Sequence, residues 1–179
     1  ASAKTGELMV NVHDYTASRQ VTIFLNLADD SSWHSERLFE NAIRLAASYA
    51  ELLLAEGIPV QLITNGIDAM TKLTLVLPAG AGTQHIRTLK EGLARLSDRS
   101  QDLPELEPLI AEKLSVTHGA DFYLLISYSQ NSRLLRTFDQ LCLQSEGSQW
   151  IAPLHNDMEF LQDRCPHAVS MKWEVSRIE

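Results

Sequence analysis

A repeated switch between two hydrophobic patterns restricts the fold of this chain more than any other property of its sequence. Short apolar runs at 21–25 (VTIFL), 58–64 (IPVQLIT) and 122–127 (FYLLIS) are typical of strands that are buried on both faces. The segments 36–56 and 83–96 instead carry apolar residues at helical spacing. Because strands alternating with helices need crossover connections, we predict an α/β, doubly wound, mostly parallel sheet with helices on both faces.

The remaining elements follow the same alternation. Leu73, Leu75 and Leu77 alternate with polar residues, which predicts an edge strand, and we expect this strand to be antiparallel. Other strands are expected over 8–15, from Trp150 and over 169–175, and further helices over 104–114 and 134–141. Pro104 suits the first turn of its helix, and Thr83 suits the N-cap of the helix that follows it.

Size and charge exclude several classes of protein. The chain has 179 residues, of which 45% are hydrophobic, and this fits a single domain over 1–179 with its own core. A formal net charge of -8 without a stripe of Lys and Arg argues against nucleic-acid binding.

No apolar run approaches the roughly 20 residues that a membrane-spanning helix needs. Cys142 and Cys165 have no paired spacing and are interpreted as reduced thiols.

In doubly wound sheets, ligands bind beyond the carboxyl ends of the strands. The loops 26–32, 78–84 and 127–132 are therefore the predicted ligand-binding edge.

Several segments of the chain are similar to a known bacterial family. These are the opening Ala1–Leu8, the blocks VTIFLNL and ENAIRLAASYAELLLAEGIPVQL, and the stretch Leu77–Leu96. They resemble the "domain of unknown function fifty-eight" family, which carries a von Willebrand factor A-like domain and is often encoded beside MoxR-type AAA+ ATPases. The resemblance implies a domain excised from a longer, membrane-anchored protein and facing the cytoplasm. Residues 1–19 would then be the tail end of a preceding β-rich region.

The resemblance also implies a magnesium site at the strand ends, built from Asp-x-Ser-x-Ser, a Thr and an Asp. In this chain the matching positions hold Asn26, Ala28, Asp30, Thr83 and Tyr128. Because Mg²⁺ prefers charged and hydroxyl oxygens, this set predicts a degenerate metal site and no cofactor. An altered Mg²⁺ site formed by Asp30, Ser32 and Thr83 is the alternative. The Asp and Ser residues of the first loop also suit turns and helix caps without any metal.

Two other groups of residues have a functional and a structural interpretation. Gly80-Ala81-Gly82-Thr83 before a helix could hold a phosphate, or it could form a tight turn. His85 could pair with Asp29 or Asp30, or it could be a solvated side chain.

Aromatic and acidic side chains near the same loops also have two interpretations. Trp33 and Tyr128 could form a contact surface or belong to the core. The acidic residues around Glu105 and Glu107 could be a solvated face or could meet a basic partner.

The sequence thus predicts a non-enzymatic protein-interaction module without catalytic residues, whose expected partner is a MoxR-type ATPase. The partner-binding edge is predicted to consist of Asn26, Asp29, Asp30, Ser31, Trp33, Thr83, His85 and Tyr128. Two alternatives stay open at this point. One is a divalent-cation-dependent adhesion domain, and the other is a nucleotide- or phosphate-handling enzyme that uses the Gly80–Thr83 turn and His85.

Overall fold

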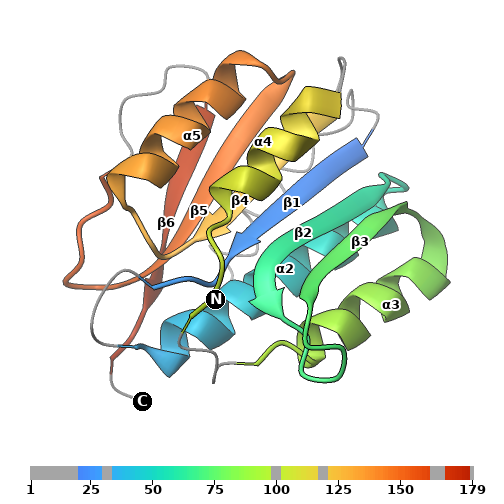
Figure 1. Cartoon of the computed structure of the whole chain (residues 1–179), viewed down its shortest axis with the longest axis horizontal. Coiled ribbons are helices and arrows are strands. Elements are labelled where there is room, and N and C mark those ends of the chain that lie inside the picture. Colours follow the sequence, from blue (N-terminus) through green and yellow to red (C-terminus); the bar gives the residue numbers. More distant parts are fainter. Residues whose placement is uncertain (1–19, 30–33, 98–101, 117–120, 162–167, 178–179) are drawn as a thin grey trace.

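A computed structural model describes residues 20–29, 34–97, 102–116, 121–161 and 168–177 of the chain. The described part contains a six-stranded sheet with the strand order β3-β2-β1-β4-β5-β6 (Figure 1). Its strands are β1 (Gln20–Asn26), β2 (Val60–Ile67), β3 (Thr74–Gly80), β4 (Asp121–Ser127), β5 (Gly147–His155) and β6 (Ala168–Val175). The strand predicted over 8–15 lies outside the described residues.

All neighbouring strands run parallel except one pair. β1 pairs in parallel with both β2 and β4, and the parallel pairing continues from β4 to β5 and from β5 to β6. β3 pairs antiparallel with β2 and forms the edge of the sheet. The predicted fold class, with its single antiparallel edge strand in the described sheet, is confirmed.

Helices cover both faces of the sheet (Figure 1). α2 (Glu36–Ala55) packs on β1, β4 and β5 and against α3 (Gly82–Ala94), so these two helices share one face. α4 (Glu107–Val116) and α5 (Ser132–Leu143) contact each other, and α5 packs on β5 from the opposite face. Among the described residues, no helix combines the length and the apolar composition that crossing a membrane requires.

The core lies between these layers. Every residue of β4 is buried, as expected for a central strand between two helical layers. On the α5 face, the rings of Phe138 and Trp150 meet edge to face with 5.2 Å between their centroids. On the other face, Ala42 and Ala46 let α2 approach the sheet closely, and Tyr49 fills the space beside them without any exposed surface.

Two helix starts differ from the predicted ones. α3 begins at Gly82, and its N-cap position is Ala81 rather than Thr83, so Thr83 lies inside the first helical turn. α4 begins at Glu107, and Pro104 therefore precedes this helix rather than standing in its first turn. A proline restricts the residue before it to an extended conformation. It is therefore as compatible with the segment that precedes a helix as with the first turn of the helix.

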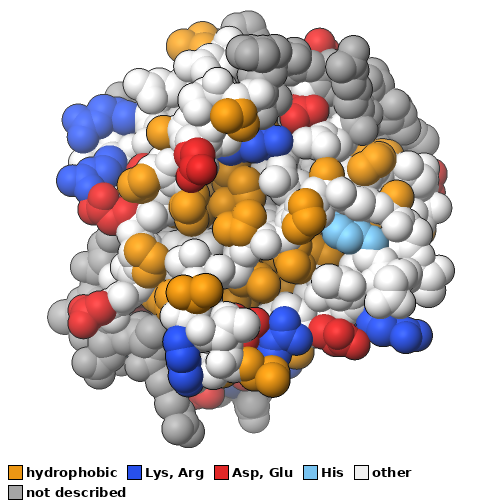
Figure 2. All heavy atoms as spheres, turned by 45° about the vertical axis from the view of Figure 1, so that its right-hand side comes forward, with side chains coloured by type: hydrophobic (Ala, Val, Ile, Leu, Met, Phe, Trp, Pro, Cys, Tyr) orange, Lys and Arg blue, Asp and Glu red, His pale blue; other side chains and the backbone are white. Residues whose placement is uncertain are grey.

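Hydrophobic side chains gather at the centre of one face of the molecule (Figure 2), in a view that turns β2 and β3 of Figure 1 forward. Val76 in the edge strand β3 contributes to the exposed apolar surface of the chain with 47% of its surface accessible. Leu75, by contrast, is buried because its side chain points toward Gly92 of α3. The alternation within β3 is the pattern expected of an edge strand with one covered face.

Candidate functional site

Three side chains form a buried hydrogen-bond network where β1, β2 and β4 end. Asn26 Nδ2 donates to Ser127 Oγ at 3.0 Å, and Asn65 Nδ2 donates to Asn26 Oδ1 at 2.8 Å. All three residues are buried. We call this group, Asn26, Asn65 and Ser127, the carboxyl-edge network. It exists because the parallel strands end side by side, with Asn26 paired to Ser127 in the register of the sheet.

Asn65 also ties the network to two loops. Its Oδ1 accepts from the backbone N–H of Leu27 at 2.9 Å, and its Nδ2 donates to the carbonyl of Pro104, also at 2.9 Å. The carboxyl-edge network therefore fixes both the loop after β1 and the segment that leads into α4. An apolar side chain at position 65 would leave these backbone groups without their partners.

Tyr128 belongs to the core rather than to an exposed contact surface. Its ring is buried, and its hydroxyl donates to the carbonyl of Leu27 at 2.6 Å. The core interpretation of Tyr128 is thus confirmed. Its inclusion as an exposed residue of the partner-binding edge is wrong, because the bond to the loop after β1 holds the side chain inside.

Thr83 and His85 do not lie at the predicted edge. Gly80 at the end of β3 pairs with Val60 at the start of β2, so the antiparallel strand carries the chain back to the amino edge of the sheet. Val60 in turn pairs with Val21, five strand positions or about 16 Å from Asn26. The predicted grouping of loop 78–84 with the loops after β1 and β4 is therefore wrong.

His85 has a structural role at the amino edge. Its Nε2 lies 2.7 Å from the carbonyl oxygen of Val60, and since a carbonyl only accepts, the ring nitrogen donates this bond. A Cβ at Gly80 would lie 2.6 Å from the ring, so the glycine makes room for it. Gly82 adopts a φ of 83°, a conformation that favours glycine. These contacts match the tight-turn interpretation of Gly80–Thr83.

Three residues of the predicted partner-binding edge, Asp30, Ser31 and Trp33, lie outside the described residues, as does Ser32 of the alternative metal set. The described N-cap of α2 is Ser35, whose Oγ accepts from the backbone N–H of Leu38 at 3.4 Å. Ser35 Oγ also lies 3.0 Å from Nε2 of the buried His155 at the end of β5. Because His155 Nδ1 lies 3.1 Å from the carbonyl of Val175, this histidine joins α2 to the ends of β5 and β6.

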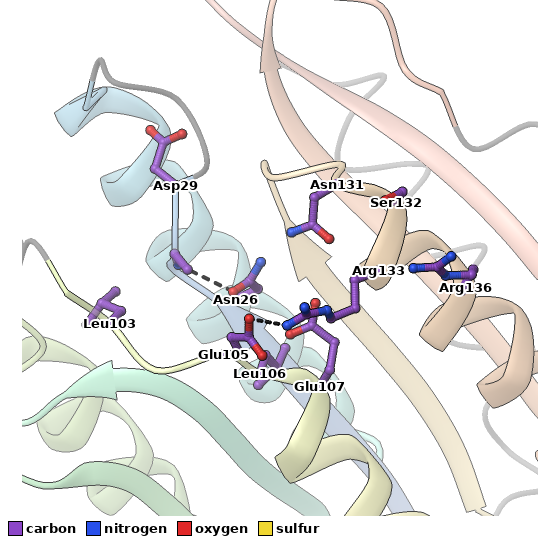
Figure 3. Close-up of a pocket in the computed structure, with 11 residues that line it drawn as sticks. Asn26, Asp29, Leu103, Glu105, Leu106, Glu107, Asn131, Ser132, Arg133 and Arg136 are labelled. Carbon is purple, nitrogen blue, oxygen red and sulfur yellow. Dashed lines mark hydrogen bonds and ion pairs between the residues drawn. The ribbon is translucent and has the colours of Figure 1, made fainter.

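A pocket of about 430 Å³ opens at the carboxyl edge, and Asn26 of the network is one of the residues that line it (Figure 3). We call it the carboxyl-edge pocket, and three segments line it. The loop after β1, the segment that leads into α4, and the first turns of α5 supply Asn26, Ala28, Asp29, Leu103, Glu105, Leu106, Glu107, Asn131, Ser132, Arg133 and Arg136. The second loop of the site is thus the segment 102–107, which takes the place that the sequence reasoning gave to loop 78–84.

Charges of both signs face the pocket. Arg133 and Glu105 form an ion pair across it, and the two side chains are 58% and 59% exposed. Figure 3 shows Asp29 and Arg136 on opposite sides, with Glu107 extending toward Arg133. The charged lining therefore places carboxylates on the β1 and α4 segments and guanidinium groups on α5.

Asn131 sets the position of the α5 wall. Its Oδ1 caps the helix by accepting from the backbone N–H of Leu134 at 2.8 Å, and its Nδ2 donates to Ser129 Oγ at 3.3 Å. Ser129 is linked to the carboxyl-edge network, since Ser127 Oγ donates to its carbonyl at 2.9 Å. The buried network thus positions both the floor and one wall of the pocket.

The described donors do not fit the magnesium site implied by the resemblance. Asn26 Oδ1 already accepts from Asn65 Nδ2 and from the backbone N–H of Ala28 at 3.3 Å, and Ala28 itself has no side-chain oxygen. Of the alternative set, Thr83 lies at the amino edge of the sheet, and Asp30 and Ser32 lie outside the described residues. No group of three His, Cys, Asp or Glu side chains suited to a metal occurs within the described ranges.

Several residues of the site were missed by the sequence reasoning. Asn65 follows the predicted strand 58–64 directly, and an amide at the end of a buried strand, opposite Asn26 on the neighbouring strand, was the available signal. Arg133 stands directly before the predicted helix 134–141 and Arg136 stands in its first turn, three residues apart and just after a ligand-edge loop. Glu105 and Glu107 were noted, but as part of an acidic face rather than as pocket residues.

Comparisons with known proteins add no family. The chain matches no protein-family model, and no curated protein is significantly similar to it in sequence.

Proposed function

We propose that this chain is a non-enzymatic protein-interaction module that binds its partner at the carboxyl edge of the sheet. The observation that carries the proposal is the carboxyl-edge pocket, in which exposed charges of both signs surround a rigid floor. Such a mixed rim, positioned by buried hydrogen bonds, suits recognition of a polar protein segment. The proposed binding residues are therefore Asp29, Glu105, Glu107, Arg133 and Arg136.

The degenerate metal site is part of this proposal. In place of a metal-ligating carboxylate, the chain has an amide, Asn26, whose oxygen and nitrogen are both used by neighbouring side chains. Because both polar atoms of the Asn26 side chain are hydrogen-bonded within the protein, this side chain stabilises the carboxyl edge and does not ligate a cation. Binding at this edge should accordingly be independent of divalent cations.

The partner and the setting come from the family resemblance alone. A MoxR-type AAA+ ATPase is the proposed partner, and the proposed setting is the cytoplasmic face of a membrane-anchored parent protein.

A matched pair of tryptophan substitutions tests which edge binds. Ser132 is the first residue of α5 and lines the carboxyl-edge pocket, whereas Thr83 is the second residue of α3 at the amino edge. Both are exposed hydroxyl residues, so Ser132→Trp and Thr83→Trp should both fold. Binding of the MoxR-type ATPase from the same organism would be measured by calorimetry, with and without EDTA.

We expect Ser132→Trp to weaken binding by about tenfold or more, as an obstructed interface contact does, and Thr83→Trp to leave it unchanged. EDTA should have no effect on the complex beyond what it does to nucleotide binding by the ATPase. A loss of binding in Thr83→Trp alone would move the interface to the amino edge. Absence of binding by the unmodified chain would rule out this class of partner.

A further inference from the structure

The amino-terminal turns of α5 carry positive charge where a helix favours negative charge. Arg133 and Arg136 are the second and fifth residues of the helix, and its first turn contains no acidic residue. The amino end of a helix is the positive end of its dipole, so cations there are disfavoured. Two like charges three residues apart on one helix add a further small repulsion. The dipole of α5 therefore gives no reason for an arginine at either position.

The pocket offsets only one of the two charges. Glu105 pairs with Arg133, but both side chains are more than half exposed, and such pairs contribute little and exchange readily. Arg136 has no ion-pair or hydrogen-bond partner among the described residues, although it lines the same pocket. The α5 side of the pocket thus carries a guanidinium group that no carboxylate among the described residues pairs with.

The carboxylates of the pocket already have structural roles. Glu105 pairs with Arg133, and Glu107 stands in the first turn of α4, where the helix dipole favours a carboxylate. Asp29 lies across the pocket from Arg136 (Figure 3) and has an interaction of its own. A cationic ligand would compete with the existing interactions of these carboxylates, whereas a carboxylate ligand would supply the ion-pair partner that Arg136 lacks among the described residues.

We infer that the carboxyl-edge pocket binds a carboxylate side chain, an Asp or Glu of the partner protein, on the guanidinium of Arg136. Arginine presents its donors in a planar fork that matches both oxygens of a carboxylate. Arg133 can turn from Glu105 to the same ligand, because their exposed pair is easily exchanged. This inference rests on the proposed function and specifies the chemistry of the partner at that site.

Short neutral-ended peptides test the inference without the natural partner. The probes are acetyl-Ala-Glu-Ala-amide, acetyl-Ala-Gln-Ala-amide and acetyl-Ala-Lys-Ala-amide, each titrated into the full chain and followed by amide chemical shifts. The Glu peptide should give saturable shifts over Ser132–Arg136 at millimolar concentration, and the Gln peptide should not. Arg136→Gln should weaken binding of the Glu peptide about fivefold, the effect expected for an exposed charged contact.

Arg87→Gln is the matched control, since Arg87 is an exposed arginine of α3 outside the pocket. It should leave the titration unchanged. Equal shifts with the Glu and Gln peptides, tighter binding of the Lys peptide, or no effect of Arg136→Gln would overturn the inference. Its failure is separate from that of the proposed function. The Glu peptide can bind when the ATPase does not, and Ser132→Trp can disrupt the complex when the Glu peptide does not bind.

Discussion

A single buried amide connects the sheet to the rim of the candidate site. Asn65 is fully buried, yet its side chain makes hydrogen bonds to Asn26, to the loop after β1 and to the segment before α4. A buried amide is tolerated only when its donors and acceptors are used, and here each bond also holds one part of the pocket in place. The polar side chain of Asn65 therefore fixes the positions of the two loops at the carboxyl edge.

Replacing Asn65 tests this role. Asn65→Ala removes three hydrogen bonds and leaves buried backbone and side-chain groups without partners, so we expect the free energy of unfolding to fall by about 2–4 kcal/mol. Chemical denaturation followed by circular dichroism measures the change. Asn156→Ala, at an exposed asparagine, is the control and should stay within about 0.5 kcal/mol. Equal stability of the two variants would show that the network contributes nothing to folding.

At the scale of the elements, one carboxylate joins the turn between β2 and β3 to the end of α3. Asp68 Oδ1 accepts from the backbone N–H groups of Met70 and Thr71 at 2.8 and 3.3 Å. Its Oδ2 accepts from Arg95 Nε at 2.9 Å. The hydrogen bond from Arg95, together with those from the backbone, holds the pKa of the Asp68 carboxyl below its usual value of 3.8.

The direction of this shift predicts a pH dependence. A carboxyl group whose pKa is lower in the folded state stabilises the fold above its unfolded pKa, and this contribution disappears as the pH falls through the folded pKa. The melting temperature of Asp68→Asn should therefore lie below that of the unmodified chain at pH 6. The two values should converge as the pH falls below 3.8.

The matched control for Asp68 is Asp157, whose pKa is also lowered by a hydrogen bond from an arginine, Arg177. The Asp157 side chain is 66% exposed, so solvent screens its pair. Asp157→Asn should change the melting temperature much less at every pH. A difference for Asp68→Asn that does not depend on pH would show that the amide disturbs packing rather than an ionic contact.

The elements themselves were largely predictable, because each has its own periodic pattern. α2 was predicted over 36–56 and observed at Glu36–Ala55, since its apolar stripe and Gly57 mark its face and its end. The candidate site was less predictable, because it depends on the direction of β3. Sequence pattern distinguishes an edge strand from a central one, but the antiparallel pairing decides at which edge the following loop, with Thr83 and His85, emerges.

At the scale of the whole molecule, the two edges of the sheet differ in what their side chains do. At the amino edge, His85 bonds to the backbone of β2, and the Lys113 ammonium lies 3.7 Å from the carboxylate of the buried Asp121. At the carboxyl edge, buried amides hold the floor while exposed charges form the rim. At this edge the buried amides stabilise the fold, whereas Arg136 lines the pocket without an ion-pair or hydrogen-bond partner among the described residues.

This difference predicts that the rim can be changed without loss of stability. Arg136→Gln removes a cation from the unfavourable end of the α5 dipole and ends its repulsion with Arg133, so its melting temperature should stay within about 2 °C of the unmodified chain or rise slightly. Differential scanning calorimetry at low and high salt measures the change in melting temperature. Because salt screens both the helix dipole and the repulsion from Arg133, any rise in melting temperature should be smaller at high salt. A melting temperature more than about 5 °C below that of the unmodified chain would mean that Arg136 stabilises the fold. Its position in the pocket would then be explained without a ligand.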